Sequence, residues 1–270
     1  MNIISWVIIP IIIIIVIVIL VIFNVQDSIV FTRQGTIVDT SHYNIPIKEV
    51  KYPSHDGIQL HGLYIKHENH DKHDNPIILF FHGNASTVSE WIRFTKRYYK
   101  WGYSVFMMEY RGYGECEGTP KEDLIYEDAM TTYRYVVNHL KYSKRKIILN
   151  GVSLGGAICI NLASKVDVAA TVVDSSFTSM ADMADIFIPY VGSYLCKLSF
   201  NSIDLIKRVR SPVLIIHSKD DRMIPFEMGK RLCRNAKRGT LIETSGSHNN
   251  SNWSSDVSRS IRNFFDKAIK

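Results

Sequence analysis

The chain has 270 residues, of which 46% are hydrophobic and 21% are charged, so it can hold one sizeable globular domain or two small ones. Its 32 basic and 26 acidic residues give a net charge of +6, which suits an anionic membrane surface but is modest for a nucleic-acid-binding protein. No base-reading motif is present, and we expect no nucleic-acid partner. The four cysteines are far apart and form no CxxC pair, so the sequence predicts neither a zinc site nor a disulfide framework.

The first predicted element is a membrane-spanning helix. Residues 3–23 contain no charged side chain, and a helix of that length spans about 31 Å, which matches the ~30 Å hydrocarbon core of a bilayer. A cleaved secretory signal is the alternative, but only Met1-Asn2 precedes the apolar stretch and no pair of small residues follows it. We therefore predict a retained single-pass anchor over residues 1–27, followed by a juxtamembrane segment over residues 28–45.

The flanking charges leave the orientation of this anchor open. Arg33 is the first basic residue after the apolar stretch, and Asp27 and Asp39 balance its charge. The positive-inside rule therefore does not predict on which side of the membrane the domain lies. Glycosylation sequons begin at Asn249 and Asn252, directly after a histidine that we identify below as a candidate catalytic residue. Because a glycan there would crowd the site, this placement favours the cytosolic side.

From about residue 46 the sequence alternates between strand-like and helix-like segments. Residues 49–53 and 58–65 predict a β-hairpin around Ser54-His55-Asp56-Gly57. Continuous apolar runs, typical of strands buried on both faces of a parallel sheet, follow at 76–81, 104–108, 146–149, 169–173, 213–216 and 240–242. Helical patterns fall between them at 88–101, 122–140, 154–165, 227–237 and 253–270. The sequence therefore predicts one α/β domain over 46–270, with a mostly parallel, doubly wound sheet and helices on both faces.

The motif Gly151-Val152-Ser153-Leu154-Gly155 directly follows the predicted strand at 146–149 and directly precedes a predicted helix. In that context a GxSxG pattern is typical of a nucleophile elbow, a sharp turn that exposes the serine hydroxyl above a helix N-terminus. The alternative is a tight turn in which Ser153 only caps the helix. We predict that Ser153 is a nucleophile because the sequence also supplies partners for it.

A serine hydroxyl needs a base, and in this arrangement an acid and then a histidine follow the serine along the chain. The strand at 213–216 leads into a loop with Asp220 and Asp221, and the strand at 240–242 leads into a loop with His248. We predict that His248 is the general base and that one of the two aspartates orients its imidazole ring. Since side chains of neighbouring residues point apart, only one aspartate can do so, and chemistry alone leaves the choice open.

An oxyanion hole is predicted from the turn after the first long strand. His82-Gly83-Asn84-Ala85 follows residues 76–81, and Gly83 lets the backbone approach a substrate carbonyl. We expect the backbone N–H groups of Asn84 and Leu154 to stabilise the oxyanion.

Five motifs together resemble the α/β-hydrolase family: His82-Gly83-Asn84-Ala85, Tyr110-Arg111-Gly112-Tyr113-Gly114, residues 151–156, residues 221–226 and residues 246–249. The resemblance covers residues 48–270 and is greatest to the membrane-anchored branch, which includes the fungal bud-emergence hydrolase and animal relatives near the protein depalmitoylases. In that family the catalytic acid stands three residues before an aliphatic-proline pair, which implies Asp221. The chain departs from the usual family residues at Glu109, Cys116 and Val152, positions that concern loop bracing and pocket lining.

Residues 175–210 form an insertion where this family places its lid. Met180, Met183 and Phe187 recur there at helical spacing. They suit a channel for an acyl chain that opens towards the bilayer, or equally a helical cap packed on the domain.

These features predict a membrane-anchored serine hydrolase that cleaves a carboxylic ester or thioester of a lipid or acylated substrate through an acyl-enzyme. The chemistry requires no metal and no cofactor. Two alternatives stay open: an amide or peptide hydrolase with the same three residues, and a catalytically silent hydrolase fold that serves as a membrane scaffold. The sequence makes no prediction about the oligomeric state.

Overall fold

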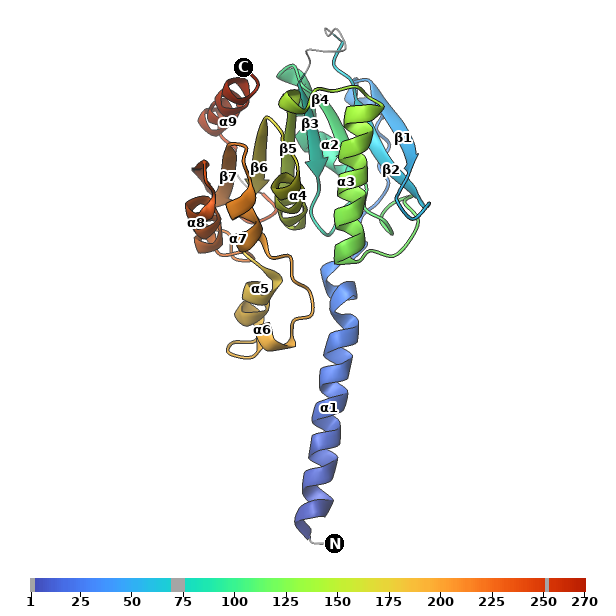
Figure 1. Cartoon of the computed structure of the whole chain (residues 1–270), viewed down its shortest axis with the longest axis vertical. Coiled ribbons are helices and arrows are strands. Elements are labelled where there is room, and N and C mark those ends of the chain that lie inside the picture. The colour runs from blue at the N-terminus through green and yellow to red at the C-terminus, as the bar shows by residue number, and fades with distance from the viewer. Residues whose placement is uncertain (1–2, 69–75, 251–252) are drawn as a thin grey trace.

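A computed structural model describes residues 3–68, 76–250 and 253–270 of the chain (Figure 1). Its centre is an eight-stranded sheet with the order β1-β2-β4-β3-β5-β6-β7-β8. The strands are β1 (Ile47–Pro53), β2 (Gln59–Ile65), β3 (Ile77–Phe81), β4 (Ser104–Met108), β5 (Ile147–Val152), β6 (Ala170–Asp174), β7 (Val213–Ser218) and β8 (Gly239–Thr244). The β1–β2 and β2–β4 pairs are antiparallel and the other pairs are parallel, which confirms the predicted sheet. Residues 251 and 252 of the two sequons lie outside the described residues.

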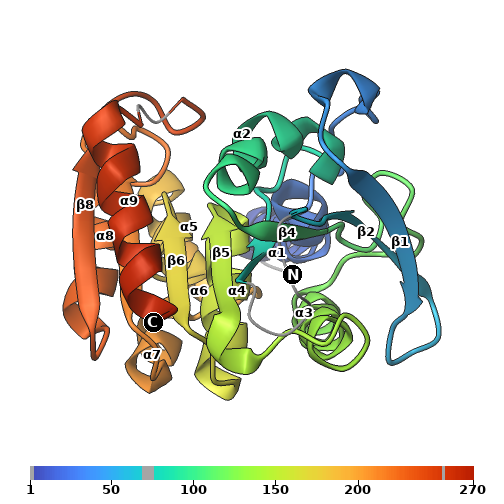
Figure 2. The same ribbon diagram turned by 90° about the horizontal axis from the view of Figure 1, so that it is seen from above.

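Helices cover both faces of this sheet (Figure 2). One face packs against α3 (Glu122–Asn138), α4 (Leu154–Lys165) and α8 (Phe226–Asn235), and the other packs against α2 (Val88–Lys100) and α9 (Ser255–Ala268). Within β3, Leu79 belongs to the first of these two cores, whereas Ile78 and Phe80 belong to the second. Every side chain of β3 is buried because successive residues point to opposite, covered faces, and this explains the continuous apolar run.

A buried ionic network joins the antiparallel hairpin to the rest of the domain. The guanidinium of Arg111 donates from Nε and Nη2 to both carboxylate oxygens of Asp128 on α3, at 2.5 and 2.6 Å. Its Nη1 donates to Asp56 in the β1–β2 turn at 2.8 Å, and Ser54 Oγ donates to Asp128 at 2.5 Å. Asp128 is fully buried and Arg111 is nearly so. The hydrogen bonds of the Arg111 guanidinium therefore hold the β1–β2 turn against α3.

The N-terminal helix α1 (Ile3–Val30) projects away from the domain (Figure 1). Among the described residues, one helix is long and apolar enough to cross a membrane, with a span over Ile8–Val30 and a mean hydropathy of 3.5. A signal sequence near the N-terminus passes the same test of length and apolar composition. The helix continues past residue 27, and the first residues of the predicted juxtamembrane segment are therefore helical.

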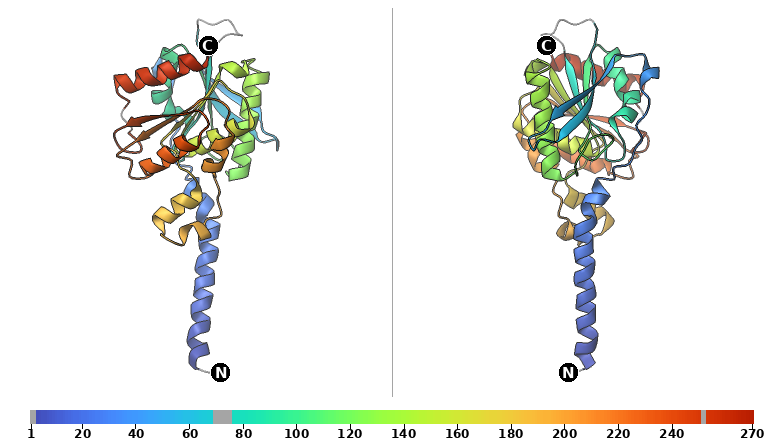
Figure 3. Two further views of the ribbon diagram at one scale, coloured as in Figure 1. Left: turned by 60° about the vertical axis from the view of Figure 1, so that its left-hand side comes forward. Right: turned by 90° about the vertical axis from the view of Figure 1, so that its right-hand side faces the viewer.

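Residues 175–210 form short helices at the end of the domain nearest to α1. They are α5 (Met180–Phe187), α6 (Gly192–Leu195) and α7 (Ser202–Leu205), followed by the 3-10 turn η3 (Ile206–Arg208). Helices α5 and α6, together with the segment between them, lie beside the C-terminal part of α1 (Figures 1 and 3), and we call residues 180–195 the cap.

Candidate active site

Ser153 lies in a strained turn between β5 and α4. Its φ and ψ angles are 54° and −119°, a conformation that non-glycine residues rarely adopt. A Cβ atom on Gly151 would lie 2.1 Å from the carbonyl oxygen of Gly155, and one on Gly155 would lie 2.1 Å from the carbonyl oxygen of Phe81. Both glycines are therefore needed for the close approach of helix and strands, and the turn has the form of a nucleophile elbow.

The three residues predicted to act together lie in one chain of hydrogen bonds. His248 Nε2 is 3.1 Å from Ser153 Oγ, and His248 Nδ1 is 2.7 Å from Asp221 Oδ2. Each side chain follows a different strand (β5, β7 and β8), so the parallel sheet brings residues 95 positions apart to one edge. This is the geometry that a nucleophile, a general base and an orienting carboxylate require.

The carboxylate of Asp221 is buried but well satisfied. Its Oδ1 accepts the backbone N–H groups of Met223 and Ile224, both at 2.9 Å. Burial raises the pKa of Asp221, but hydrogen bonds from His217, His248 and the Ile224 backbone outweigh it and hold the pKa well below its usual value. The carboxylate is therefore ionised at neutral pH. Asp220 instead accepts the Gly246 N–H at 3.1 Å and braces the loop that carries His248.

The predicted oxyanion loop lies against Ser153. A Cβ built on Gly83 would be 3.7 Å from the Cβ of Ser153, so the backbone next to Asn84 is close to the reacting hydroxyl. Asn84 is fixed by the residues that end α1, because its Nδ2 donates to the Val30 carbonyl at 3.2 Å and its own carbonyl accepts from Thr32 Oγ1 at 2.8 Å. Leu154 begins α4, where the first backbone N–H groups of a helix have no intrahelical acceptor.

Glu109 contacts this loop. It stands at a position where the α/β-hydrolase family usually has a different residue. Its Oε1 is 2.9 Å from Nε2 of the buried His82, and its Oε2 accepts the backbone N–H of Val88 at 3.1 Å. His82 also stacks on Tyr110, with ring centroids 4.0 Å apart. Glu109 thus links the turn after β3 to the start of α2.

An apolar pocket of about 470 Å³ opens at Ser153 and runs between α1 and the cap. The predicted substrate-binding residues Met180, Met183 and Phe187 all line it, so the structure places them in the same pocket as Ser153. The opposite wall is formed by Ile22, Gln26, Ile29 and Val30 of α1. The sequence had assigned these four residues only to the membrane helix and the segment after it.

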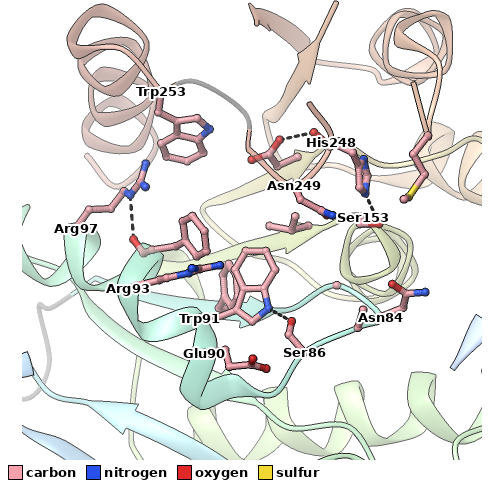
Figure 4. Close-up of a pocket in the computed structure, with 18 of the residues that line it drawn as sticks. Asn84, Ser86, Glu90, Trp91, Arg93, Arg97, Ser153, His248, Asn249 and Trp253 are labelled. Atoms are coloured by element: carbon pink, nitrogen blue, oxygen red, sulfur yellow. Dashed lines mark hydrogen bonds between the residues drawn. The ribbon is translucent and has the colours of Figure 1, made fainter. Parts of the chain in front are cut away.

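A second pocket, of about 370 Å³, lies on the other side of Ser153 and His248, and we call it the arginine pocket (Figure 4). Its walls include Trp91, Arg93 and Arg97 of α2 and Trp253. The Arg97 guanidinium carbon lies 4.4 Å from the centre of the Trp253 ring, and Arg97 Nε donates to the Phe94 carbonyl at 2.9 Å. No local sequence pattern predicts this pocket, because its residues come from segments about 150 positions apart.

Asp174, at the end of β6, is a buried acid in the wall of the arginine pocket. Burial raises the pKa of Asp174 from 3.8 to about 6, although Ser175 Oγ donates to it at 3.0 Å and His217, His248 and Arg97 act in the opposite direction. The fold thus favours the protonated acid. This contribution to stability is complete below pH 3.8 and is lost as the pH rises through about 6.

We accordingly expect Asp174→Asn to stabilise the domain at high pH only. A change from 3.8 to about 6 corresponds to up to about 3 kcal/mol in the free energy of unfolding at pH 8. Urea titrations in detergent at pH 8 and pH 4 measure this, and most of the gain should vanish at pH 4. An equal gain at both pH values would contradict a buried, titrating Asp174.

Comparisons with known proteins show the family of the chain. Residues 72–199 match the family model described as "Serine aminopeptidase, S33". The chain is 30% identical over 190 residues to the protein bem46 of Schizosaccharomyces pombe, an alignment that covers 68% of this chain and 63% of that protein. It is 31% identical over 196 residues to the protein YfhR of Escherichia coli, which covers 70% of this chain and 68% of that protein. The chain belongs to the α/β-hydrolase family.

The fold of this α/β hydrolase is also that of solved structures. The esterase Pf2001 of Pyrococcus furiosus superposes with a TM-score of 0.70 at 18% identity, over 88% of this chain and all of that one. At this identity the likeness concerns the fold. The chain spans less than two thirds of the length of bem46. Family and fold together place the chain among the α/β hydrolases, and its structural neighbours include an esterase.

Proposed function

We propose that the chain is a membrane-anchored serine hydrolase that cleaves a carboxylic ester or thioester, with Ser153 as nucleophile, His248 as general base and Asp221 as orienting acid. The observation that carries this proposal is the unbroken hydrogen-bonded chain from Ser153 Oγ to Asp221 at the mouth of an apolar pocket. A scaffold that binds without catalysis has no need of this arrangement, so it argues against the silent alternative.

The reaction follows from the positions of these groups. His248 Nε2 removes the proton of Ser153 Oγ as the oxygen attacks the carbonyl carbon, and the Asp221 carboxylate stabilises the imidazolium that forms. The N–H groups of Asn84 and Leu154 hold the oxyanion, worth a few kcal/mol in the transition state. The imidazolium then protonates the departing alcohol or thiol, and the same base activates a water molecule that releases the acid from Ser153.

The two pockets suit the two halves of such a substrate. The apolar pocket has the volume of a small-molecule site and suits an acyl chain, held by Met180, Met183 and Phe187. The arginine pocket is more polar and suits the leaving group, which in a lipid or an acylated protein is larger and more hydrophilic than the acyl chain. Hydrolysis of an amide by the same residues is the second candidate, since the matching family model is described as a serine aminopeptidase.

We propose that α1 is retained as a single-pass anchor over residues 1–27, with a connecting segment over 28–45 and the hydrolase domain over 46–270. Ile22 supports this, because it forms part of the wall of the apolar pocket and cleavage after the apolar stretch would remove it. We place the domain on the cytosolic side, where Asn249 would not carry a glycan beside His248.

A test of the acyl side uses Ala184, which lines the apolar pocket on α5. Ala184→Trp should fill the pocket and lower the ratio of kcat/KM for a palmitoyl thioester to that for an acetyl thioester at least tenfold. Ala181→Trp is the matched control, since it places the same ring on the same helix but not among the pocket's lining residues. An unchanged ratio in Ala184→Trp would mean that the acyl chain binds elsewhere.

A further inference from the structure

The cap exposes a group of large apolar side chains. They are Ile186, Phe187, Ile188, Tyr190, Val191 and Tyr194, and three of them are almost fully accessible: Phe187 at 71%, Tyr190 at 92% and Tyr194 at 83%. Among the described residues outside α1, exposed large apolar side chains are otherwise only Ile37 and Met223. Such a concentration of exposed apolar side chains on one surface indicates a site that a membrane or another apolar surface covers.

This surface lies beside the membrane helix and is fastened to it. The cap flanks the C-terminal part of α1 and extends in the direction of the helix's N-terminus, as two views about the same axis show (Figure 3). Gln26 Nε2 donates to the carbonyl of Leu195 at 2.7 Å, and Gln26 Oε1 accepts the backbone N–H of Lys197 at 2.8 Å. Lys197 Nζ also pairs with Asp27 at 2.8 Å.

These polar contacts indicate where a bilayer ends along α1. Trp6, 68% exposed, is the aromatic residue near the other end of the helix. The rise from Trp6 to Gln26 is about 30 Å at ~1.5 Å per residue, which equals the thickness of the hydrocarbon core. The Gln26, Asp27 and Lys197 cluster then lies at headgroup level. The cap, joined to α1 at that cluster, meets the same interface, where tyrosine side chains are favoured.

The apolar pocket connects this interface to the nucleophile. Ile22 and Ile29 of α1 and Phe187 and Ile188 of the cap line the same pocket as Ser153. Phe187 belongs both to the pocket lining and to the exposed surface, so the two are continuous.

We propose that the exposed apolar surface of the cap inserts into the membrane leaflet next to α1, and that the acyl chain of a bilayer-embedded substrate enters the apolar pocket between α1 and the cap. This inference rests on the proposed function and adds the route and the substrate class, an acyl ester or thioester presented by the bilayer. The acyl chain of the substrate then passes from the lipid to the pocket without entering water, so the free-energy cost of exposing its apolar surface to water does not arise.

The first experiment measures insertion without relying on activity. The full chain, as Tyr194→Cys labelled with an environment-sensitive fluorophore, is reconstituted in phosphatidylcholine vesicles that contain nitroxide lipids. Ser260→Cys, on an exposed face of α9, and the unsubstituted chain are labelled as controls for position and for the native thiols. We expect lipid quenching at position 194 only. A probe at 194 that is not quenched would overturn the proposal, whether water or a second copy of the chain covers it.

The second experiment tests the route. Tyr190→Glu/Tyr194→Glu should lower kcat/KM at least tenfold for a palmitoyl thioester embedded in vesicles, but leave a water-soluble acetyl ester within twofold of the wild type. Tyr190→Phe/Tyr194→Phe, which keeps the apolar surface, should retain both activities. Equal loss on both substrates, or no loss on either, would contradict the route. If the proposed function itself fails, the wild type shows no Ser153-dependent turnover of either substrate, whereas lipid quenching at 194 can still occur.

Discussion

His248→Ala is expected to lower kcat for ester or thioester hydrolysis by about 10⁴–10⁶-fold, because Ser153 then has no base at 3.1 Å to take its proton. The effect on folding should be small. Asp221 keeps the backbone N–H groups of Met223 and Ile224, so loss of the imidazole leaves the carboxylate largely satisfied. Steady-state kinetics of the purified full chain measure the first effect, and thermal unfolding in the same detergent measures the second.

The neighbouring aspartate provides the matched control for this experiment. Asp220→Asn changes a carboxylate one position from Asp221, but its contact is to the Gly246 backbone rather than to the histidine. We expect it to retain most of the activity, whereas Asp221→Asn should lose about 10⁴-fold because the imidazole is no longer held in the required tautomer. Comparable activity of His248→Ala and wild type would rule out the proposed base.

Asp128→Asn is expected to lower the free energy of unfolding by about 3–5 kcal/mol. The substitution removes the charge that the buried Arg111 guanidinium binds with two hydrogen bonds and leaves that guanidinium with only the Asp56 carboxylate. A buried guanidinium that loses its buried carboxylate partner, and keeps only one that is partly exposed, costs more than the pair itself contributes. Urea titration of the domain followed by tryptophan fluorescence measures the change.

An exposed ion pair provides the control for Asp128→Asn. Asp204 and Lys207 pair at 2.7 Å on the surface, and both side chains are more than half exposed. Asp204→Asn should therefore lower the free energy of unfolding far less than Asp128→Asn does. If Asp128→Asn and Asp204→Asn cost the same, the Arg111 network does not stabilise the domain in the way its burial indicates.

The strands and helices were largely predictable because their signals are local, but the ends of the central strands were not. The apolar run that predicts β5 stops at Leu149, whereas the strand continues to Val152. Asn150 is buried there because Tyr98 OH donates to its Oδ1 at 2.8 Å, a partner on α2 that no local pattern reveals. Likewise β7 extends through the buried His217, whose Nε2 lies 2.9 Å from the carbonyl oxygen of Ile224.

Some residues of the candidate site were likewise predictable from local motifs, whereas others depend on contacts between distant segments. Ser153 and the predicted oxyanion loop each belong to a motif of only a few residues, which can be read directly from the sequence. The order of the strands then predicts where His248 and an aspartate lie. The choice of Asp221 over Asp220 came from family resemblance. The role of Ile22, Gln26 and Ile29 in the apolar pocket was not predictable, since it depends on contacts with residues more than 150 positions away. In the sequence these residues are indistinguishable from the rest of the apolar helix and the segment that follows it.

Labelling with a fluorophosphonate probe tests the central proposal most directly, because the probe reacts only with a serine that a base activates in an oxyanion site. The folded, full-length wild type in membranes should take up the label through a bond from Ser153 Oγ to phosphorus, with loss of fluoride. Ser153→Ala should take up none. A folded wild type that stays unlabelled, or a Ser153→Ala variant labelled to the same extent, would contradict the account.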